Sequence, residues 1–218
     1  MTLDLDPDRR LALAYAPASA RAALDALWRL DVTLGAVLAG KREPMVARIR
    51  LAWWREALER LDSAPPPAEP VLQALAAHVL PAGVEGAALA ALEEGWSILL
   101  AEGPLEGGAL QSYAWLRGGL LFRYSAHLLG GPDEVEPAGA RWALVDLARH
   151  STNPAEAAAA LRAAAGIAPE PAWPRALRPL AMLSLLARRD LQRLPSPLER
   201  QGSPARMLRL LKYRLTGR

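Results

Sequence analysis

Cysteine is absent from this sequence of 218 residues, and phenylalanine occurs once. The lack of cysteine excludes a disulfide framework, a thiol nucleophile and a cysteine-ligated metal, and it fits a reducing compartment. No apolar run is long enough to span a bilayer, and the N-terminus opens on Asp4, Asp6 and Asp8 rather than on a basic and then apolar segment. We therefore expect a cytoplasmic protein without a signal peptide or a membrane span.

The signatures of several functional classes are missing as well. The three histidines, His78, His127 and His150, belong to different predicted helices and do not have metal-binding spacing. The serines show no nucleophile signature, and there is no glycine-rich phosphate loop. The formal net charge is only +3, which by itself gives no reason to expect nucleic acid as a partner. These absences leave hydrolase chemistry and nucleic-acid binding without support.

The abundant residues favour helices. Hydrophobic residues make up 52% of the chain, alanine and leucine dominate, and prolines and glycines cluster between apolar periodic segments. We predict an all-α, single-domain helical bundle over residues 1–218. The expected helices cover residues 18–38, 43–61, 71–80, 86–101, 110–129, 139–150, 155–165, 178–194 and a terminal stretch from 204.

Asp31 is the first residue that could carry chemistry. The other residues on its helical stripe are all leucines: Leu24, Leu27, Leu34 and Leu38. Its carboxylate is therefore expected to face inward, where it needs a partner. One interpretation is a ligand of a metal or diphosphate site. The other is a carboxylate that pairs with an arginine such as Arg50 or Arg55, or that reaches water.

Two further blocks stand out from the helical pattern. Trp53 and Trp54 are adjacent, and since neighbouring residues point about 100° apart on a helix, one of them is expected to be mostly buried. Gly118 and Gly119 lie inside the predicted helix 110–129, where the lack of side chains lets another helix or a ligand approach. Both blocks can also be explained by core packing and a tight helix crossing alone.

These blocks resemble the squalene/phytoene synthase family, in the branch that includes mitochondrial complex I assembly factors and their bacterial relatives. The similar residues are 42–45, 50–58, 113–114 and 118–122, with weaker similarity at 139–144, 187–191 and from 202 to the end. The resemblance implies an isoprenoid (terpenoid) synthase fold, in which two DxxxD helices face each other across a central cavity and hold Mg²⁺ against prenyl diphosphates. The candidate cavity or ligand-binding residues are Asp31, Arg50, Trp53, Tyr113, Gly118, Gly119, Asp146 and His150.

The sequence departs from that pattern at both motifs. Asp31 resembles the first acid of the first motif, but Gly35 stands four residues later. Asp146 stands where the second motif is expected, and the residue four positions later is His150. One carboxylate on each helix is a poor site for several Mg²⁺ ions. Asp31 and Asp146 are nevertheless the candidate metal ligands, with Glu93 and Glu94 as additions, and Mg²⁺ is the expected cofactor if the protein is catalytic.

The predicted C-terminal helix is strongly basic. No acid follows Glu199, whereas the basic residues beyond it are Arg200, Arg206, Arg209, Lys212, Arg214 and Arg218. One side of this helix carries Leu208, Leu211 and Leu215. It could lie on an anionic membrane. Alternatively, it is a last helix that docks on the core and leaves a basic face in water.

Two functions fit these observations. We favour a non-catalytic relative that uses the scaffold as a binding or respiratory-complex assembly module. Its expected contacts are a prenyl diphosphate or another apolar ligand, a protein partner, or the surface of the inner membrane. The alternative is an active Mg²⁺-dependent prenyltransferase that condenses two prenyl diphosphates head-to-head, and an unrelated helical scaffold is a third. In the first two cases, Asp31 and Asp146 are expected to face a common interior region.

Overall fold

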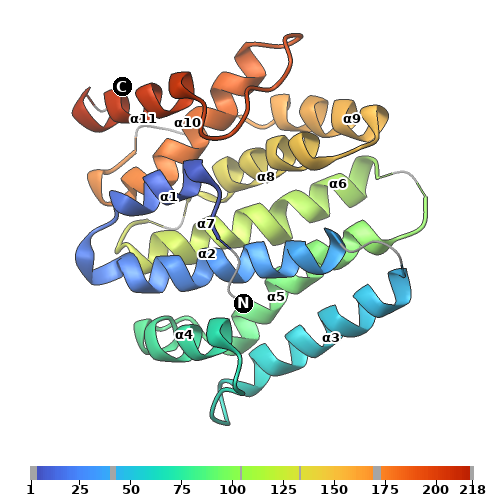
Figure 1. Cartoon of the computed structure of the whole chain (residues 1–218), viewed down its shortest axis with the longest axis vertical. Coiled ribbons are helices and arrows are strands. Elements are labelled where there is room, and N and C mark those ends of the chain that lie inside the picture. The colour runs from blue at the N-terminus through green and yellow to red at the C-terminus, as the bar shows by residue number, and fades with distance from the viewer. Residues whose placement is uncertain (1–3, 40–42, 104, 133, 169–172, 217–218) are drawn as a thin grey trace.

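The computed structural model describes residues 4–39, 43–103, 105–132, 134–168 and 173–216, and none of these residues lies in a β-strand. The all-α prediction is therefore confirmed for the described part of the chain. The α-helices are α1 (Pro7–Ala14), α2 (Ala18–Ala39), α3 (Pro44–Arg60), α4 (Pro70–His78), α5 (Gly86–Ser97), α6 (Gly107–Tyr113), α7 (Leu120–Leu128), α8 (Glu136–His150), α9 (Pro154–Ala165), α10 (Arg178–Gln192) and α11 (Pro204–Thr216) (Figure 1).

First-turn prolines and a capping side chain explain where several of these helices begin. Proline stands in the first turn of α1, α3, α4, α8, α9 and α10, where a missing backbone N–H costs nothing. The Asp6 side chain caps α1 by accepting hydrogen bonds from the backbone N–H groups of Asp8 and Arg9, each at 3.0 Å. Helix α1 was absent from the sequence prediction, although Asp6-Pro7 is a cap followed by a first-turn proline.

The predicted helix 110–129 is one rod of three parts. It consists of α6, a π-helical segment (Ala114–Gly119) and α7. The π segment packs against α8, and Gly118 and Gly139 make the crossing tight. A Cβ atom added to Gly118 would lie 2.1 Å from the carbonyl oxygen of Gly139, and a Cβ on Gly139 would lie equally close to the oxygen of Gly118. The Gly118 position is thus filled by another helix.

The helices enclose a continuous hydrophobic core that extends from Leu5 to Leu210. Trp28, Tyr113 and Phe122 are among its largest fully buried side chains. In Figure 1, α2, the α6–α7 rod and α8 lie beside one another, α3 packs on α5 at one end of the view, and α10 and α11 lie at the other. Among the described residues, no helix combines the length and the apolarity that a bilayer crossing requires.

Candidate functional site

Asp31 is fully buried on α2, and both of its carboxylate oxygens are occupied by protein donors. Oδ1 accepts hydrogen bonds from Nε of Arg117 at 2.9 Å and from the indole N–H of Trp96 at 3.0 Å. Oδ2 accepts from Nη1 of Arg9 at 2.9 Å and from Nη2 of Arg117 at 3.1 Å. These donors come from α1, α5 and the π segment, so Asp31 ties three parts of the chain to α2.

Arg117 connects this carboxylate to the second predicted aspartate. Its Nη2 also donates to Oδ2 of Asp146 on α8 at 2.7 Å, and its Nη1 donates to the hydroxyl of Tyr113. The centre of the guanidinium lies 4.0 Å from the ring centroid of Trp96 and 5.0 Å from that of Trp142. Asp31 and Asp146 therefore face a common interior region, as predicted, and a buried guanidinium lies between them.

We call Arg9, Asp31, Arg117 and Asp146 the arginine–aspartate network. Burial raises the pKa of both carboxyls, but the guanidinium groups of Arg117 and Arg9 outweigh it. They hold the pKa of Asp31 below its usual value and lower the pKa of Asp146 to about 2, with a further contribution from His150. Burial lowers the pKa of Arg117, whereas Asp31, Tyr113 and Asp146 raise it, and the net shift is well upward. Asp31, Asp146 and Arg117 are therefore ionised at neutral pH.

The positions four residues after each aspartate cannot complete a DxxxD motif. A Cβ on Gly35 would lie 2.7 Å from Cη2 of Trp96, so the indole ring fills the space that a side chain there would need. His150 is 62% exposed in its side chain, and its Nδ1 lies 2.8 Å from the backbone oxygen of Asp146 and 3.5 Å from Oδ1. Neither position supplies an oxygen ligand.

The donor set does not fit a magnesium site. Mg²⁺ requires several hard oxygen ligands in octahedral geometry. Here the four acceptor positions of Asp31 are taken by arginine and tryptophan donors, and Asp146 is paired with Arg117. Across the part of the chain that the structure describes, no group of three or more His, Asp or Glu side chains has metal-binding geometry.

Other predicted residues lie away from the network. Arg50 and Trp53 are exposed on the outer face of α3, with 45% of Trp53 accessible. Trp54 is only 7% accessible, which confirms that one tryptophan of the pair is buried. Asp31 pairs with arginine, as one interpretation of the sequence expected, but its partners are Arg9 and Arg117 and not Arg50 or Arg55. Arg55 instead pairs with Glu93 of α5, whose Oε2 accepts from its Nε at 2.6 Å.

Sequence reasoning missed the two arginines that neutralise the site. Arg117 follows Tyr113 by four residues in the predicted helix 110–129, and this spacing on one helical face was an available signal for an inward arginine. Arg9 gave no such signal because α1 was not recognised as a helix. The resemblance implies a central cavity between the two aspartates. In this structure Arg117 lies there, and Trp96, Tyr113 and Trp142 surround it.

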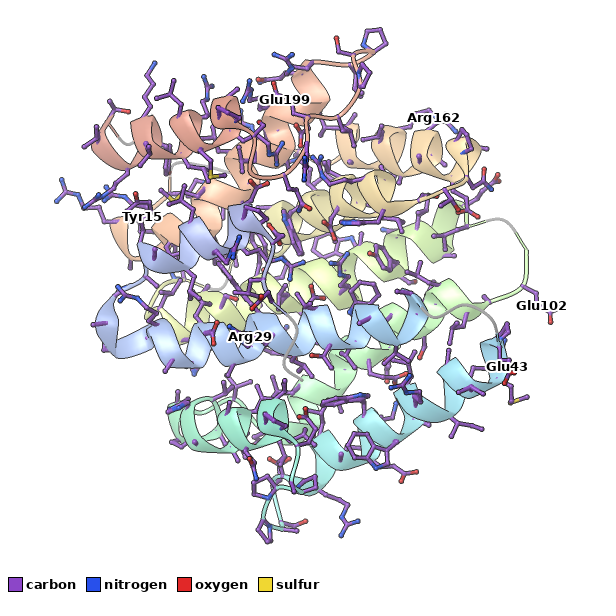
Figure 2. The ribbon with its side chains drawn as sticks, in the orientation of Figure 1. Tyr15, Arg29, Glu43, Glu102, Arg162 and Glu199 are labelled. Atoms are coloured by element: carbon purple, nitrogen blue, oxygen red, sulfur yellow. The ribbon has the colours of Figure 1, made fainter. Side chains whose placement is uncertain are left out.

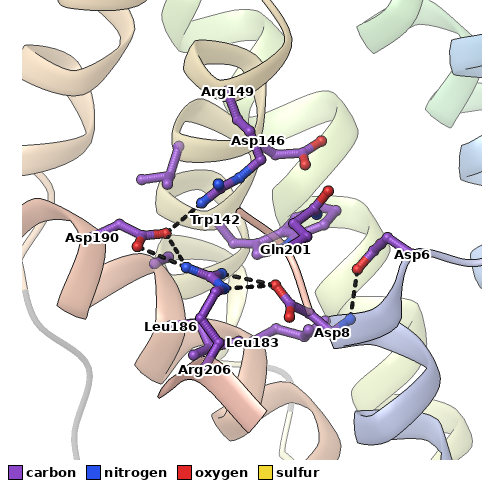
Figure 3. A pocket seen from close by; sticks show the side chains of 12 residues that line it. Asp6, Asp8, Trp142, Asp146, Arg149, Leu183, Leu186, Asp190, Gln201 and Arg206 are labelled. Atoms are coloured by element: carbon purple, nitrogen blue, oxygen red, sulfur yellow. Dashed lines mark hydrogen bonds and ion pairs between the residues drawn. The ribbon is translucent and has the colours of Figure 1, made fainter. Parts of the chain in front are cut away.

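A second ionic cluster adjoins the network and holds the C-terminal helix. Figure 3 shows Arg206 of α11 between Asp8 and Asp190, with Arg149 on the other side of Asp190. Nη1 of Arg206 lies 2.7 Å from Asp190, and Nη2 lies 2.8 Å from Asp8. These groups border a cavity of about 20 Å³ that reaches Asp146. That volume is about the size of one water molecule, far too small for a prenyl chain.

Comparisons with known proteins identify the family and the fold of the chain. The family model of squalene/phytoene synthase matches residues 4–168, which include the whole arginine–aspartate network. The chain belongs to the squalene/phytoene synthase family. Among solved structures, the crystal structure of a dehydrosqualene synthase in complex with ligand matches with a TM-score of 0.69. The match covers 94% of this chain and 89% of that one at 14% identity, so the two share the isoprenoid synthase fold.

None of the curated proteins is a significant match to the chain. The family and the fold of this squalene/phytoene synthase family member are therefore established, whereas its chemistry depends on its own residues. The relevant departure from the family motifs lies in the two aspartates, which contact arginines where the family pattern implies metal.

Proposed function

We propose that this protein is a non-catalytic member of the squalene/phytoene synthase family that acts as a binding or respiratory-complex assembly module. The observation that carries the proposal is the guanidinium of Arg117, which donates to Asp31 and to Asp146 at the same time. The carboxylates that would hold metal in the family pattern are instead the anionic partners of a permanent cation.

Electrostatics argue against magnesium-dependent ionisation of a diphosphate at this site. Such a reaction needs a cluster of divalent ions around the leaving group. A divalent ion beside Asp31 would have to displace Arg117, which is buried and also bonded to Tyr113, or lie next to its positive charge. Breaking a buried ion pair by removing one partner typically costs about 3–5 kcal/mol, so metal binding would compete with the stability of the fold.

The retained fold supports a binding or assembly role. The interior remains closely packed, with the π segment and α8 touching backbone to backbone. In the branch that the sequence resembles, relatives serve complex I assembly, and we propose the same kind of role here. Such a module would act by contacting a protein partner or a membrane surface.

Isothermal titration calorimetry tests the first half of the proposal. The purified protein is titrated with non-hydrolysable farnesyl and geranylgeranyl diphosphate analogues, with and without Mg²⁺, beside a dehydrosqualene synthase as positive control. In a parallel assay, both proteins are incubated with farnesyl and geranylgeranyl diphosphate themselves, and the extracts are analysed for condensed product. We expect no Mg²⁺-dependent heat and no condensed C30 or C40 product. Mg²⁺-dependent binding with turnover would overturn the proposal and identify a head-to-head prenyltransferase.

A deletion strain of the source organism tests the second half. We expect less assembled complex I in its membranes, with squalene and carotenoid levels unchanged, and recovery when the wild-type gene is restored. Unchanged complex I together with lost isoprenoid product would contradict an assembly role. Restoration with an Arg50→Ala variant, which alters only an exposed residue of α3, serves as the matched control.

A further inference from the structure

Helix α11 presents three of its four leucines to solvent instead of to the core. Leu208 is 68% accessible, Leu211 41% and Leu215 83%, whereas the buried residues of this helix are Arg206 and Leu210. At about 100° per residue, the three exposed leucines fall within an arc of about 60°. They form one apolar stripe, which we call the leucine stripe, and a stripe of this kind on a surface helix marks a contact site.

The leucine stripe is bordered by cations on both sides. Lys212 and Arg209 lie on one flank and Arg214 on the other, and all three are exposed. The chain contains no acid after Glu199. Arg214 also lies over the ring of Tyr15, 4.6 Å from its centroid, so the flank continues toward the end of α1, where Figure 2 labels Tyr15. The surface around the stripe therefore carries positive charge without compensating carboxylates on this helix.

The orientation of α11 is fixed by the ionic cluster beneath it. Arg206 is buried between Asp8 and Asp190, and those carboxylates raise its pKa against the effect of burial. Because Arg206 is neutralised inside the protein, the cations that α11 presents on its surface are Arg209, Lys212 and Arg214. The helix is held in place by α1 and α10 before any contact is made.

We propose that the leucine stripe of α11 and its basic flanks dock the protein on an anionic lipid membrane. A lipid surface offers both parts of the required chemistry, an apolar layer for the leucines and a continuous sheet of negative headgroups for the cations. The stripe is about two turns long, or about 10 Å, which suits shallow insertion and is small for a stable protein interface. A symmetric second copy would bring basic flank against basic flank. The docking deepens the proposed function, since it names what the module binds, but it does not depend on loss of catalysis.

Vesicle sedimentation tests the proposal. The full chain is mixed with vesicles of pure phosphatidylcholine or of phosphatidylcholine with phosphatidylglycerol, at low and at raised salt. We expect binding to the anionic vesicles only, and weaker binding as salt rises. The double variant Arg209→Glu/Lys212→Glu is expected to lower the partition coefficient at least about 25-fold, since each removed cation accounts for about fivefold. Leu208→Ser/Leu215→Ser is expected to lower it to a similar extent without changing the circular dichroism spectrum.

The matched control is Met45→Ser/Ile49→Ser, which removes two apolar side chains that are 66% and 62% exposed from α3, at the other end of the molecule in Figure 1. This variant should bind anionic vesicles like the wild type. Absence of binding to anionic vesicles at low salt, or binding that neither α11 variant weakens, would overturn the proposal. Self-association that the leucine variant abolishes, without lipid binding, would also overturn it in favour of a protein partner. These readouts involve no prenyl diphosphate, so they can fail independently of the proposed function.

Discussion

The indole ring of Trp96 lies against the backbone of Gly35, so that a Cβ atom there would come within 2.7 Å of Cη2. The same indole donates its N–H to Asp31, one helical turn earlier, at 3.0 Å. The same side chain thus excludes a second acid at position 35 and occupies one acceptor position of Asp31, whose charge is neutralised by Arg9 and Arg117. A tryptophan on α5 occupies the space in which a metal ligand would stand.

Replacing Gly35 with alanine should therefore destabilise the protein. The rigid ring must shift to admit even a methyl group, and overpacking of this kind typically costs about 1–3 kcal/mol. Urea unfolding measures the change. Gly108→Ala is the matched control, because a Cβ there would meet nothing within 4 Å, and it should be neutral or slightly stabilising. An unchanged unfolding midpoint for Gly35→Ala would show that the ring moves freely.

Gly35→Asp restores the spacing of a DxxxD motif but should not restore metal binding. The new carboxylate would meet Trp96, while Asp31 would still be bonded to Arg9 and Arg117. We expect a lower melting temperature than for Gly35→Ala and no increase on addition of Mg²⁺. Thermal unfolding with and without Mg²⁺ checks this. A Mg²⁺-dependent rise in melting temperature would contradict the prediction, because it would mean that Asp31 can exchange its arginine partners for a metal ion.

Arg117→Met should be one of the most damaging single substitutions in the chain. It leaves the carboxylate of Asp146 without its guanidinium partner and Asp31 with only Arg9 and Trp96 as donors. The expected cost is about 3–5 kcal/mol. Arg117→Lys should recover part of it, because the charge remains but the forked geometry does not. Arg50→Met, at an exposed position on α3, is the control, and equal effects of the two methionine variants would exclude a buried network.

The stability of the protein should fall in strong acid in a defined window. The pKa of Asp146 is lowered to about 2 in the folded state, against about 4 in an unfolded chain. A carboxyl with a depressed folded pKa contributes stability that is fully present above the unfolded value and is lost as the pH falls through the folded value. For Asp146 alone this amounts to about 2–3 kcal/mol, lost between about pH 4 and pH 2.

Two neighbouring carboxyls modify that acid response. Asp31 adds to it in the same direction, because its pKa is also lowered by Arg117 and Arg9. Asp6 opposes it, because burial raises its pKa. Unfolding free energies measured from pH 6 to pH 2 should show a shallower fall for Asp146→Asn than for the wild type. The exposed Glu102→Gln variant should follow the wild-type curve, and an Asp146→Asn curve parallel to the wild type would argue against this role of Asp146.

Gly118→Ala should destabilise the crossing of the π segment with α8. The added methyl group would lie 2.1 Å from the oxygen of Gly139 and 2.6 Å from Cβ of Ala143, and backbone atoms cannot turn away as a flexible side chain can. We expect a loss of about 3 kcal/mol or more, at the upper end of overpacking effects. Calorimetric melting of this variant beside Gly108→Ala measures it. A melting temperature within about one degree of the control would rule out a backbone-to-backbone contact.

Much of the helical structure could be predicted from the sequence, because its signals are local. Proline in the first turn, glycine and proline breaks, and the spacing of leucines set the helix ends to within a few residues for α2, α3 and α4. The same periodicity placed Asp31 among buried leucines, and its side chain is indeed inside. The spacing of apolar residues reports which side chains share a face, and this property belongs to a single helix.

Only the tertiary structure decided what each face meets. Asp31 is neutralised by arginines 22 and 86 residues away, a pairing that no local pattern contains. On α11 the sequence showed a leucine side and a basic side but did not show which one is covered. The covered side is the one with Arg206, because Asp8 of α1 and Asp190 of α10 neutralise its charge there. Burial of an ion depends on partners that other segments bring, so the sequence determined the helices, and their packing determined the site and the exposed surface.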